Sequence, residues 1–216
     1  MPKLPHPRRP LITLRARDVR TLRRGTTLYR VYRTRGAHAA GWDAFRDFGP
    51  TSARFDPHLA PPHVQDRHVL YAAGSIATAL AEAFGATRVI EASRDGPYLA
   101  GFRLARSVRL LDLASDWPTR AGASQAMSSG RKDIARAWAQ AIFEEYDTDG
   151  LWYPSSMSGT ARRPGDPRHH GYAVALFGAG SDALPAHPVL NLALDHPAIG
   201  AAIARVAERF GYGLVP

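Results

Sequence analysis

The segment VLYAAGSIATALAEAF, Val69–Phe84, constrains the fold more than any other part of the chain. An apolar strand passes through a Gly-Ser turn directly into a helix. Ser75 is a residue type that caps helix N-termini well, and Gly85 stands where a left-handed C-terminal glycine is expected. The helix has one apolar face, made of Ile76, Leu80, Ala83 and Phe84. Its single carboxylate, Glu82, lies off that face, which predicts either a carboxylate at a cleft or an ordinary surface side chain.

Further strands and helices follow from the same kind of pattern. Residues 27–33, TLYRVYR, alternate between two faces and predict a strand, with Leu28, Arg30 and Tyr32 on one side. Other strands are predicted at 68–73, 98–104, 108–113, 151–154 and 172–178. Two more helices are predicted, one capped by Ser128 or Ser129 and one near the C-terminus with Pro197 in its first turn. Strands outnumber helices and do not alternate with them regularly, which predicts an α+β fold with mixed or antiparallel sheets.

The length of 216 residues favours one domain, predicted over residues 11–216. Residues 1–10 contain four prolines and three basic residues, so a flexible arm is expected there. This N-terminus has no apolar signal region, and no apolar run approaches a membrane span, so a soluble cytoplasmic protein is expected. The absence of cysteine excludes a disulfide framework, a thiolate nucleophile and cysteine-ligated zinc.

The chain carries a formal charge of +9, and nearly all of its basic residues are arginine. Arginine binds phosphate and carboxylate groups in a bidentate way, so an anionic partner is expected; the alternative is a bias of genome composition. His169 and His170 have no acidic partner at ligand spacing, and we predict no metal site.

Four polar residues at or near strand ends join Glu82 as candidate site residues. They are Arg30, Arg54, Tyr71 and Ser155. Each has a structural alternative: Arg30 as the charge of an edge strand, Tyr71 as a core aromatic, and Ser155 as a turn former.

The order of five sequence blocks resembles the RES-domain family, the toxin halves of bacterial toxin–antitoxin pairs. The blocks are LYRV at 28–31, ARFDP at 53–57, Val69–Phe84, GLWYPSS at 150–156 and YAVALFG at 172–178. The resemblance covers about residues 26–180. It implies an ADP-ribosyltransferase-like fold and an enzyme that consumes NAD as its substrate. The nicotinamide–ribose bond would be cleaved by phosphorolysis or by hydrolysis, with inorganic phosphate as co-substrate in the first case and no further cofactor.

The resemblance assigns roles to residues that match the family motifs. Arg30, Tyr71 and Glu82 would be catalytic, while Arg54 and Ser155 would bind substrate, with Ser156 as the alternative to Ser155. The family often has an arginine shortly after this serine. Here that role is empty or falls to Arg162 or Arg163, within a long polar loop at 156–171.

The family also implies partners: a cognate DNA-binding antitoxin, and a homodimer within the toxin–antitoxin complex. Two other functions stay open at this point. One is an ADP-ribosyltransferase that modifies a macromolecule, and the other is a non-catalytic, basic nucleic-acid-binding module.

Overall fold

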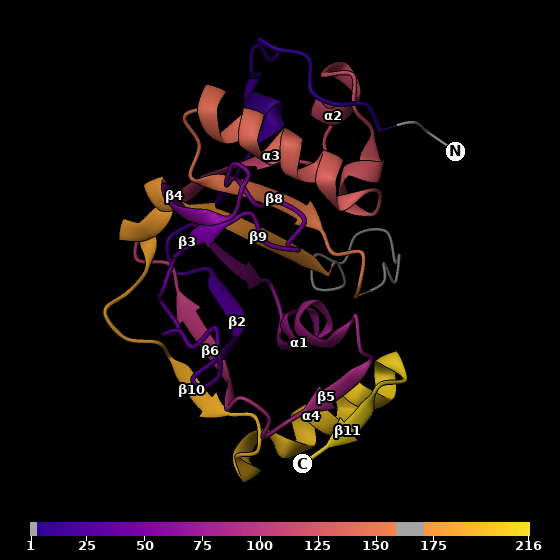
Figure 1. Ribbon diagram of the computed structural model, residues 1–216. Helices are drawn as coiled ribbons and strands as arrows, with labels where there is room; N and C mark the ends of the chain where they lie inside the picture. Colours follow the sequence, from indigo (N-terminus) through magenta and orange to yellow (C-terminus); the bar gives the residue numbers. More distant parts are fainter. Residues whose placement is uncertain (1–3, 159–170) are drawn as a thin grey trace.

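The computed structural model describes residues 4–158 and 171–216, in which nine strands form one sheet (Figure 1). In spatial order the strands are β1 (Val19–Leu22), β7 (Val108–Asp112), β8 (Gly150–Pro154), β9 (Tyr172–Phe177), β4 (His63–Ala73), β2 (Thr27–Arg33), β6 (Pro97–Arg103) and β10 (Leu190–Ala193), with β3 (Arg46–Gly49) also paired to β4. Strands β7 and β8 pair in parallel, and the other described pairs of this sheet are antiparallel. This arrangement confirms the α+β prediction.

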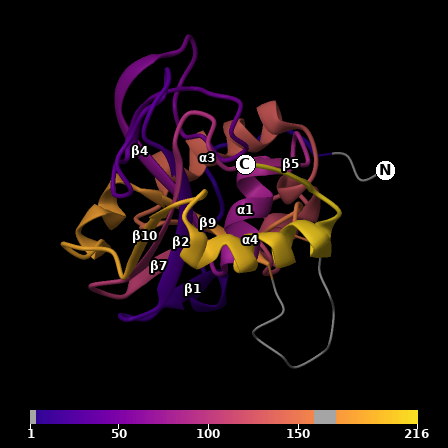
Figure 2. The ribbon, with the colours of Figure 1, turned by 90° about the horizontal axis from the view of Figure 1, so that it is seen from below.

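Helices pack against both halves of the sheet. They are α1 (Ile76–Phe84), α2 (Trp117–Arg120), α3 (Lys132–Glu145) and α4 (Pro197–Phe210), with 3₁₀ turns at Ala16–Asp18, Gln125–Ser128 and Gly178–Ala183. A small parallel sheet joins β5 (Val89–Glu91) to β11 (Gly213–Val215). Seen from below, α4 lies alongside α1 (Figure 2). Within the described residues, no helix is long and apolar enough to cross a membrane.

The sheet divides at the junction of β2 and β4. The two strands share a single register pair, Tyr29 with Ala73, whereas β2 pairs with β6 along its whole length. One half-sheet therefore contains β1, β7, β8, β9, β4 and β3, and the other contains β2, β6 and β10. The two halves lie at an angle, with α1 beside the junction (Figure 1).

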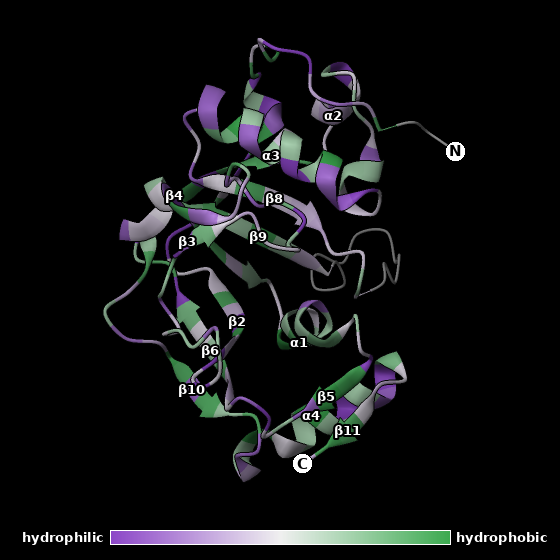
Figure 3. Cartoon of the chain, in the orientation of Figure 1, coloured by the Kyte–Doolittle hydropathy of each residue, from purple (hydrophilic) through white to green (hydrophobic). Residues whose placement is uncertain are grey.

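Alternation of side chains along the strands fills three apolar clusters. In β9, Ala173, Ala175 and Phe177 face α3, while Val174 and Leu176 face the space between the half-sheets. Burial on both faces explains why this strand reads as a continuous apolar run. The third cluster joins α1 and α4 to β5 and β6. Hydrophobic residues dominate β5 and β10, and α3 carries both hydrophilic and hydrophobic stripes (Figure 3).

The predicted strand at 27–33 and the predicted helix after Ser75 form as expected, and Ser75 accepts a hydrogen bond from the Thr78 N–H at 3.1 Å. The role predicted for Gly85 is wrong, because its φ of −63° is right-handed and the chain turns later, at Arg88 with a φ of 54°. A glycine is still favoured here for space: a Cβ would lie 2.5 Å from the Ala81 carbonyl oxygen, and 2.2 Å from the flexible methyl end of Met157.

The predicted cap of α3 is also wrong. The helix begins after Arg131, and Ser128 ends the preceding 3₁₀ turn. The Gly130 N–H donates to the Ala126 carbonyl, so the chain completes this turn before it enters α3. Such a turn depends on local backbone geometry that a serine at the right distance does not reveal.

Residues 4–10, which were expected to belong to a flexible arm, pack against α3. The indole N–H of Trp138 donates to the Pro5 carbonyl at 2.8 Å, and Leu4 joins the apolar cluster under α3. Arg9 pairs with Glu144 and Glu145 at the end of the helix. Composition indicated flexibility, but Leu4 packs against the apolar cluster that contains Trp138, and the Pro5 carbonyl accepts the indole N–H.

We predict that deletion of residues 1–10 lowers the free energy of unfolding by about 1–3 kcal/mol, because apolar surface around Trp138 becomes exposed. Thermal or urea unfolding measures this change. Deletion of residues 1–3 is the control, since it leaves the contacts of Leu4, Pro5 and Arg9 in place. Equal stability of the two deletions would contradict the packing role of this segment.

Candidate active site

A cavity of about 620 Å³ opens at the junction between the two half-sheets. Its walls come from β2, β4, α1, the loop at 51–54, the start of α3 and the ends of β8 and β9. Five of the six predicted site residues line it: Arg30, Arg54, Tyr71, Glu82 and Ser156. The sixth, Ser155, is buried directly behind Glu82. The volume is within the range of small-molecule and cofactor sites, about 300–1,000 Å³.

The carboxylate of Glu82 is held by the end of β8. The Ser155 hydroxyl donates to Glu82 Oε1 at 2.5 Å, and the same oxygen of Ser155 accepts the N–H groups of Met157 and Ser158, each at 3.2 Å. The Ser155 N–H donates to the Gly171 carbonyl, which fixes the turn. Glu82 therefore has a defined orientation, while the residue as a whole remains exposed to solvent at the cavity.

Burial raises the pKa of the Glu82 carboxyl above its ordinary value, since the cavity wall removes water from around the group. Three groups oppose this shift by favouring the ionised form: the Ser155 hydroxyl, and the positive charges of Arg54 and Lys132. Because these effects oppose one another, the pKa of Glu82 responds to small changes in its partners. Perturbed pKa values of this kind are typical of functional sites.

Two cations face Glu82 from different elements. Arg54 lies in the loop before β4, where its guanidinium donates to the Gly130 carbonyl ahead of α3, and burial lowers the pKa of this group. Lys132 is the first residue of α3. Lys132 is not among the residues predicted from the sequence, because a lysine at the start of a helix carries no signal of its own.

Arg30 is not the charge of an edge strand, because β2 is paired on both sides. Its guanidinium donates to the carbonyls of Trp42 at 3.0 Å and Ala44 at 2.9 Å. Burial lowers the pKa of Arg30 to about 10, which leaves it positively charged at neutral pH. These contacts hold the arginine in the wall of the cavity.

Two tyrosines form the floor. Burial raises the pKa of both Tyr71 and Tyr153, and the negative charge of Glu82 adds to the shift at Tyr153. Among the described residues, the Tyr71 hydroxyl has no hydrogen-bond partner, although the charge of Arg46 is close enough to favour its ionised form slightly. Tyr153, also missed from the sequence, packs against Phe55 in a tilted arrangement with ring centroids 4.5 Å apart. Both hydroxyls stay protonated at neutral pH and are available as donors.

The structure places Ser155 and Ser156, the two alternatives for the family serine, in different surroundings. Ser155 binds Glu82, while Ser156 lines the cavity itself. Arg162, Arg163, His169 and His170, with most of the loop predicted at 156–171, lie outside the described residues.

Of the described residues that line the cavity, three are cationic, Arg30, Arg54 and Lys132, and Glu82 is the single acid. Such a set can bind a phosphorylated ligand through the cations and stabilise a developing positive charge through the carboxylate. Within the described residues, no three His, Asp or Glu side chains gather at metal-ligand spacing.

The fold resembles a toxin chain of known structure, that of the MbcT–MbcA toxin–antitoxin complex of M. tuberculosis. The TM-score is 0.54 at 17% sequence identity, over 87% of this chain and 92% of that chain. The profile of the RES domain matches residues 27–197. Because this match spans more than half of the chain, the protein belongs to the RES domain family. No curated protein matches it in sequence.

We predict that Ser155→Ala raises the pKa of Glu82 further, because the ionised carboxylate loses its hydroxyl donor. Titration of a ¹³C-labelled Glu82 carboxyl by NMR measures the pKa. Ser156→Ala is the matched control and should leave the titration unchanged. A shift in the Ser156 variant instead would mean that the two serines exchange roles in solution.

The raised pKa also predicts how Glu82 affects stability. The folded state binds the Glu82 proton more tightly than the unfolded state, so the free energy of unfolding falls as pH rises from the ordinary glutamate value through the folded pKa. Glu82→Gln should therefore melt at a higher temperature than wild type at pH 7.5. The difference should vanish below about pH 4, where both states of wild type are protonated. A lower melting temperature for Glu82→Gln at pH 7.5 would contradict this account.

Proposed function

We propose that this protein is a toxin that cleaves the nicotinamide–ribose bond of NAD and is neutralised by a cognate antitoxin. The observation that carries the proposal is the single carboxylate of Glu82, held by Ser155 and faced by Arg54 and Lys132 in one cavity. Membership in the RES domain family and the fold shared with a toxin from a toxin–antitoxin complex support the same role.

The residues suit the chemistry that this reaction needs. NAD carries a diphosphate, which arginine binds with charge-assisted hydrogen bonds. Nicotinamide is already a good leaving group, so the protein has to orient the ribose and stabilise the positive charge that develops as the bond breaks. The Glu82 carboxylate can do this by its charge and by accepting a ribose hydroxyl. No metal or covalent nucleophile is needed.

Each remaining residue has a role in this proposal. Arg30 and Arg54 would hold phosphate oxygens from opposite walls. Tyr71 would stack on or hydrogen-bond the nicotinamide end. Ser155 would keep Glu82 oriented, and Ser156 would contact ribose or phosphate. The acceptor of the ribosyl group is inorganic phosphate in phosphorolysis and water in hydrolysis. Both are small enough for the same cavity, so its residues suit either reaction.

The partners belong to the proposal as well. A small DNA-binding antitoxin would bind the toxin, and the net charge of +9 would accelerate its encounter with an acidic antitoxin segment. A homodimer of the toxin within the complex completes this proposal.

The test is nicotinamide release from NAD by purified protein, with and without inorganic phosphate. Glu82→Gln should reduce release by about 100-fold or more, because it removes the charge that stabilises the transition state. Glu208→Gln, at an exposed position of α4, is the control and should keep wild-type activity.

Release that requires phosphate would identify a phosphorylase, and release without it a hydrolase. Transfer of label from NAD to cellular macromolecules would favour the ADP-ribosyltransferase alternative. If wild type leaves NAD intact under all these conditions, the proposed activity is wrong.

A further inference from the structure

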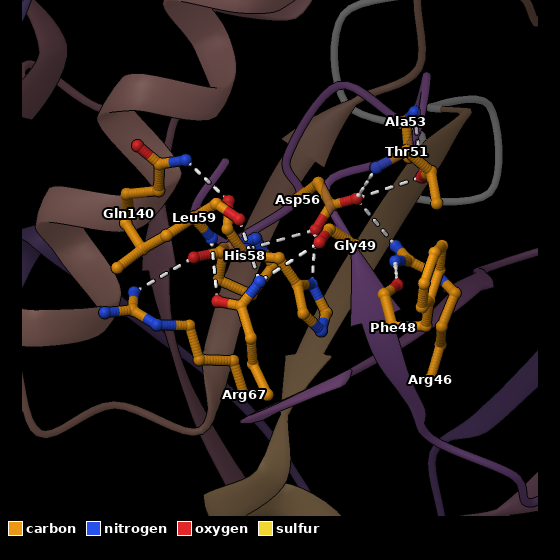
Figure 4. Close-up of polar contacts among 12 residues, drawn as sticks. Arg46, Phe48, Gly49, Thr51, Ala53, Asp56, His58, Leu59, Arg67 and Gln140 are labelled. Atoms are coloured by element: carbon orange, nitrogen blue, oxygen red, sulfur yellow. Dashed lines mark hydrogen bonds and ion pairs between the residues drawn. The ribbon is translucent and has the colours of Figure 1, made fainter. Parts of the chain in front are cut away.

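A fully buried carboxylate, Asp56, closes the loop that forms one wall of the cavity (Figure 4). Its Oδ2 accepts the Thr51 N–H at 2.7 Å, the Thr51 hydroxyl at 2.9 Å and an Arg46 guanidinium N–H at 3.0 Å. Its Oδ1 accepts the His58 N–H at 3.2 Å and lies 2.5 Å from His58 Nδ1. One side chain thus ties the start of the loop, its end and strand β3 together.

The far end of this loop is fixed in turn. Gln140 of α3 donates to the His58 carbonyl at 2.6 Å, and Arg67 of β4 donates to the Pro57 carbonyl at 3.0 Å (Figure 4). His58 is itself fully buried. Burial alone would raise the pKa of Asp56, but the bonds from Thr51 and His58 and the charge of Arg46 outweigh it and hold the pKa below its ordinary value. Asp56 therefore stays ionised and keeps all its donors.

The first four residues of the loop face the cavity. Thr51, Ser52, Ala53 and Arg54 line it, whereas Asp56 does not. The next side chain, Phe55, is fully buried against Tyr153. The loop therefore directs Arg54 toward Glu82 and Phe55 into the core.

Arginine has a long side chain whose ordering costs conformational entropy. An arginine that binds a ligand therefore binds it more tightly when its backbone and its guanidinium are both held in place beforehand. The guanidinium of Arg54 is held by the Gly130 carbonyl. The position of the Arg54 backbone depends on the conformation of the loop. Asp56 fixes that conformation by accepting the N–H groups of Thr51 and His58.

We propose that Asp56 is a positioning residue of this site, which holds Arg54 opposite Glu82 by closing the loop from Thr51 to His58. The kinetic consequence rests on the proposed function, because it is measured as NAD cleavage. The geometric consequence does not depend on it.

The test compares Asp56→Asn with a matched control, Asp18→Asn. An amide has one acceptor oxygen where the carboxylate has two, so Asp56→Asn gives up one of the two sets of contacts. Asp18 is also fully buried and accepts a backbone N–H, from Arg15 at 2.7 Å, and an arginine, Arg120, but it does not line the cavity. Both variants should melt at lower temperature than wild type.

We predict that Asp56→Asn alone lowers kcat/KM for nicotinamide release by about 10- to 100-fold, mainly through a higher KM for NAD, since Arg54 is displaced from its binding position. Asp18→Asn should keep kcat and KM within about twofold of wild type, as expected when only stability changes. The measurement is made at a temperature where the folded fraction of each variant exceeds about 95% by circular dichroism, so that loss of folded protein cannot account for a 10-fold change.

A second readout does not need activity. The positive charge of Arg54 lowers the pKa of the Glu82 carboxyl, alongside the Ser155 hydroxyl and Lys132. Displacement of Arg54 should raise that pKa in Asp56→Asn, measured by ¹³C NMR titration, and leave it unchanged in Asp18→Asn. If wild type releases no nicotinamide, the proposed function fails, while this titration still decides the positioning role.

Asp56→Asn with wild-type kcat/KM and a wild-type Glu82 titration would overturn the proposal. If Asp56→Asn does not fold, Arg46→Met replaces it. Arg46 is partly exposed, lies outside the cavity wall and donates one bond to Asp56, so a smaller change in the same direction is expected in both readouts. No change in either readout would overturn the proposal equally.

Discussion

The single register pair between β2 and β4, Tyr29 with Ala73, is the constraint on which the site depends. Beyond this pair the strands separate, and apolar side chains fill the space between the half-sheets on one side. On the other side the separation leaves the cavity, with α1 along it. The turn into α1 needs Gly74, because a Cβ there would lie 2.2 Å from the Tyr172 ring. The divergence of two paired strands thus produces a cavity of ligand-binding size inside a continuous sheet.

The electrostatic balance at Glu82 follows from this geometry. Placing a carboxylate in the junction removes water from it, which raises its pKa, while the Ser155 hydroxyl, Arg54 and Lys132 favour the ionised form. Each of these three partners comes from a different segment: the end of β8, the loop before β4 and the start of α3. The pKa of the carboxylate is therefore a property of the assembled fold, and movement of any of these segments changes it.

The wall opposite α1 is ordered by a second, deeper layer of polar contacts. Asp56 satisfies donors from Thr51, Arg46 and His58 without touching the cavity. Holding a binding side chain through a buried network lowers the entropy that ligand binding has to overcome. This organisation agrees with membership in the RES domain family and with a fold shared at low sequence identity with a toxin of known structure.

Local pattern by itself determined the strand at 27–33, the helix after Ser75 and the position of Glu82 off the apolar face, since periodicity and capping act over a few residues. The family motifs identified six residues that the structure gathers around one cavity. Tertiary structure alone decided the rest. Lys132 lines the cavity because α3 begins there, Gly85 packs against Met157, and the segment 4–10 lies against Trp138. Those outcomes depend on contacts between segments far apart in the sequence, which local pattern does not encode.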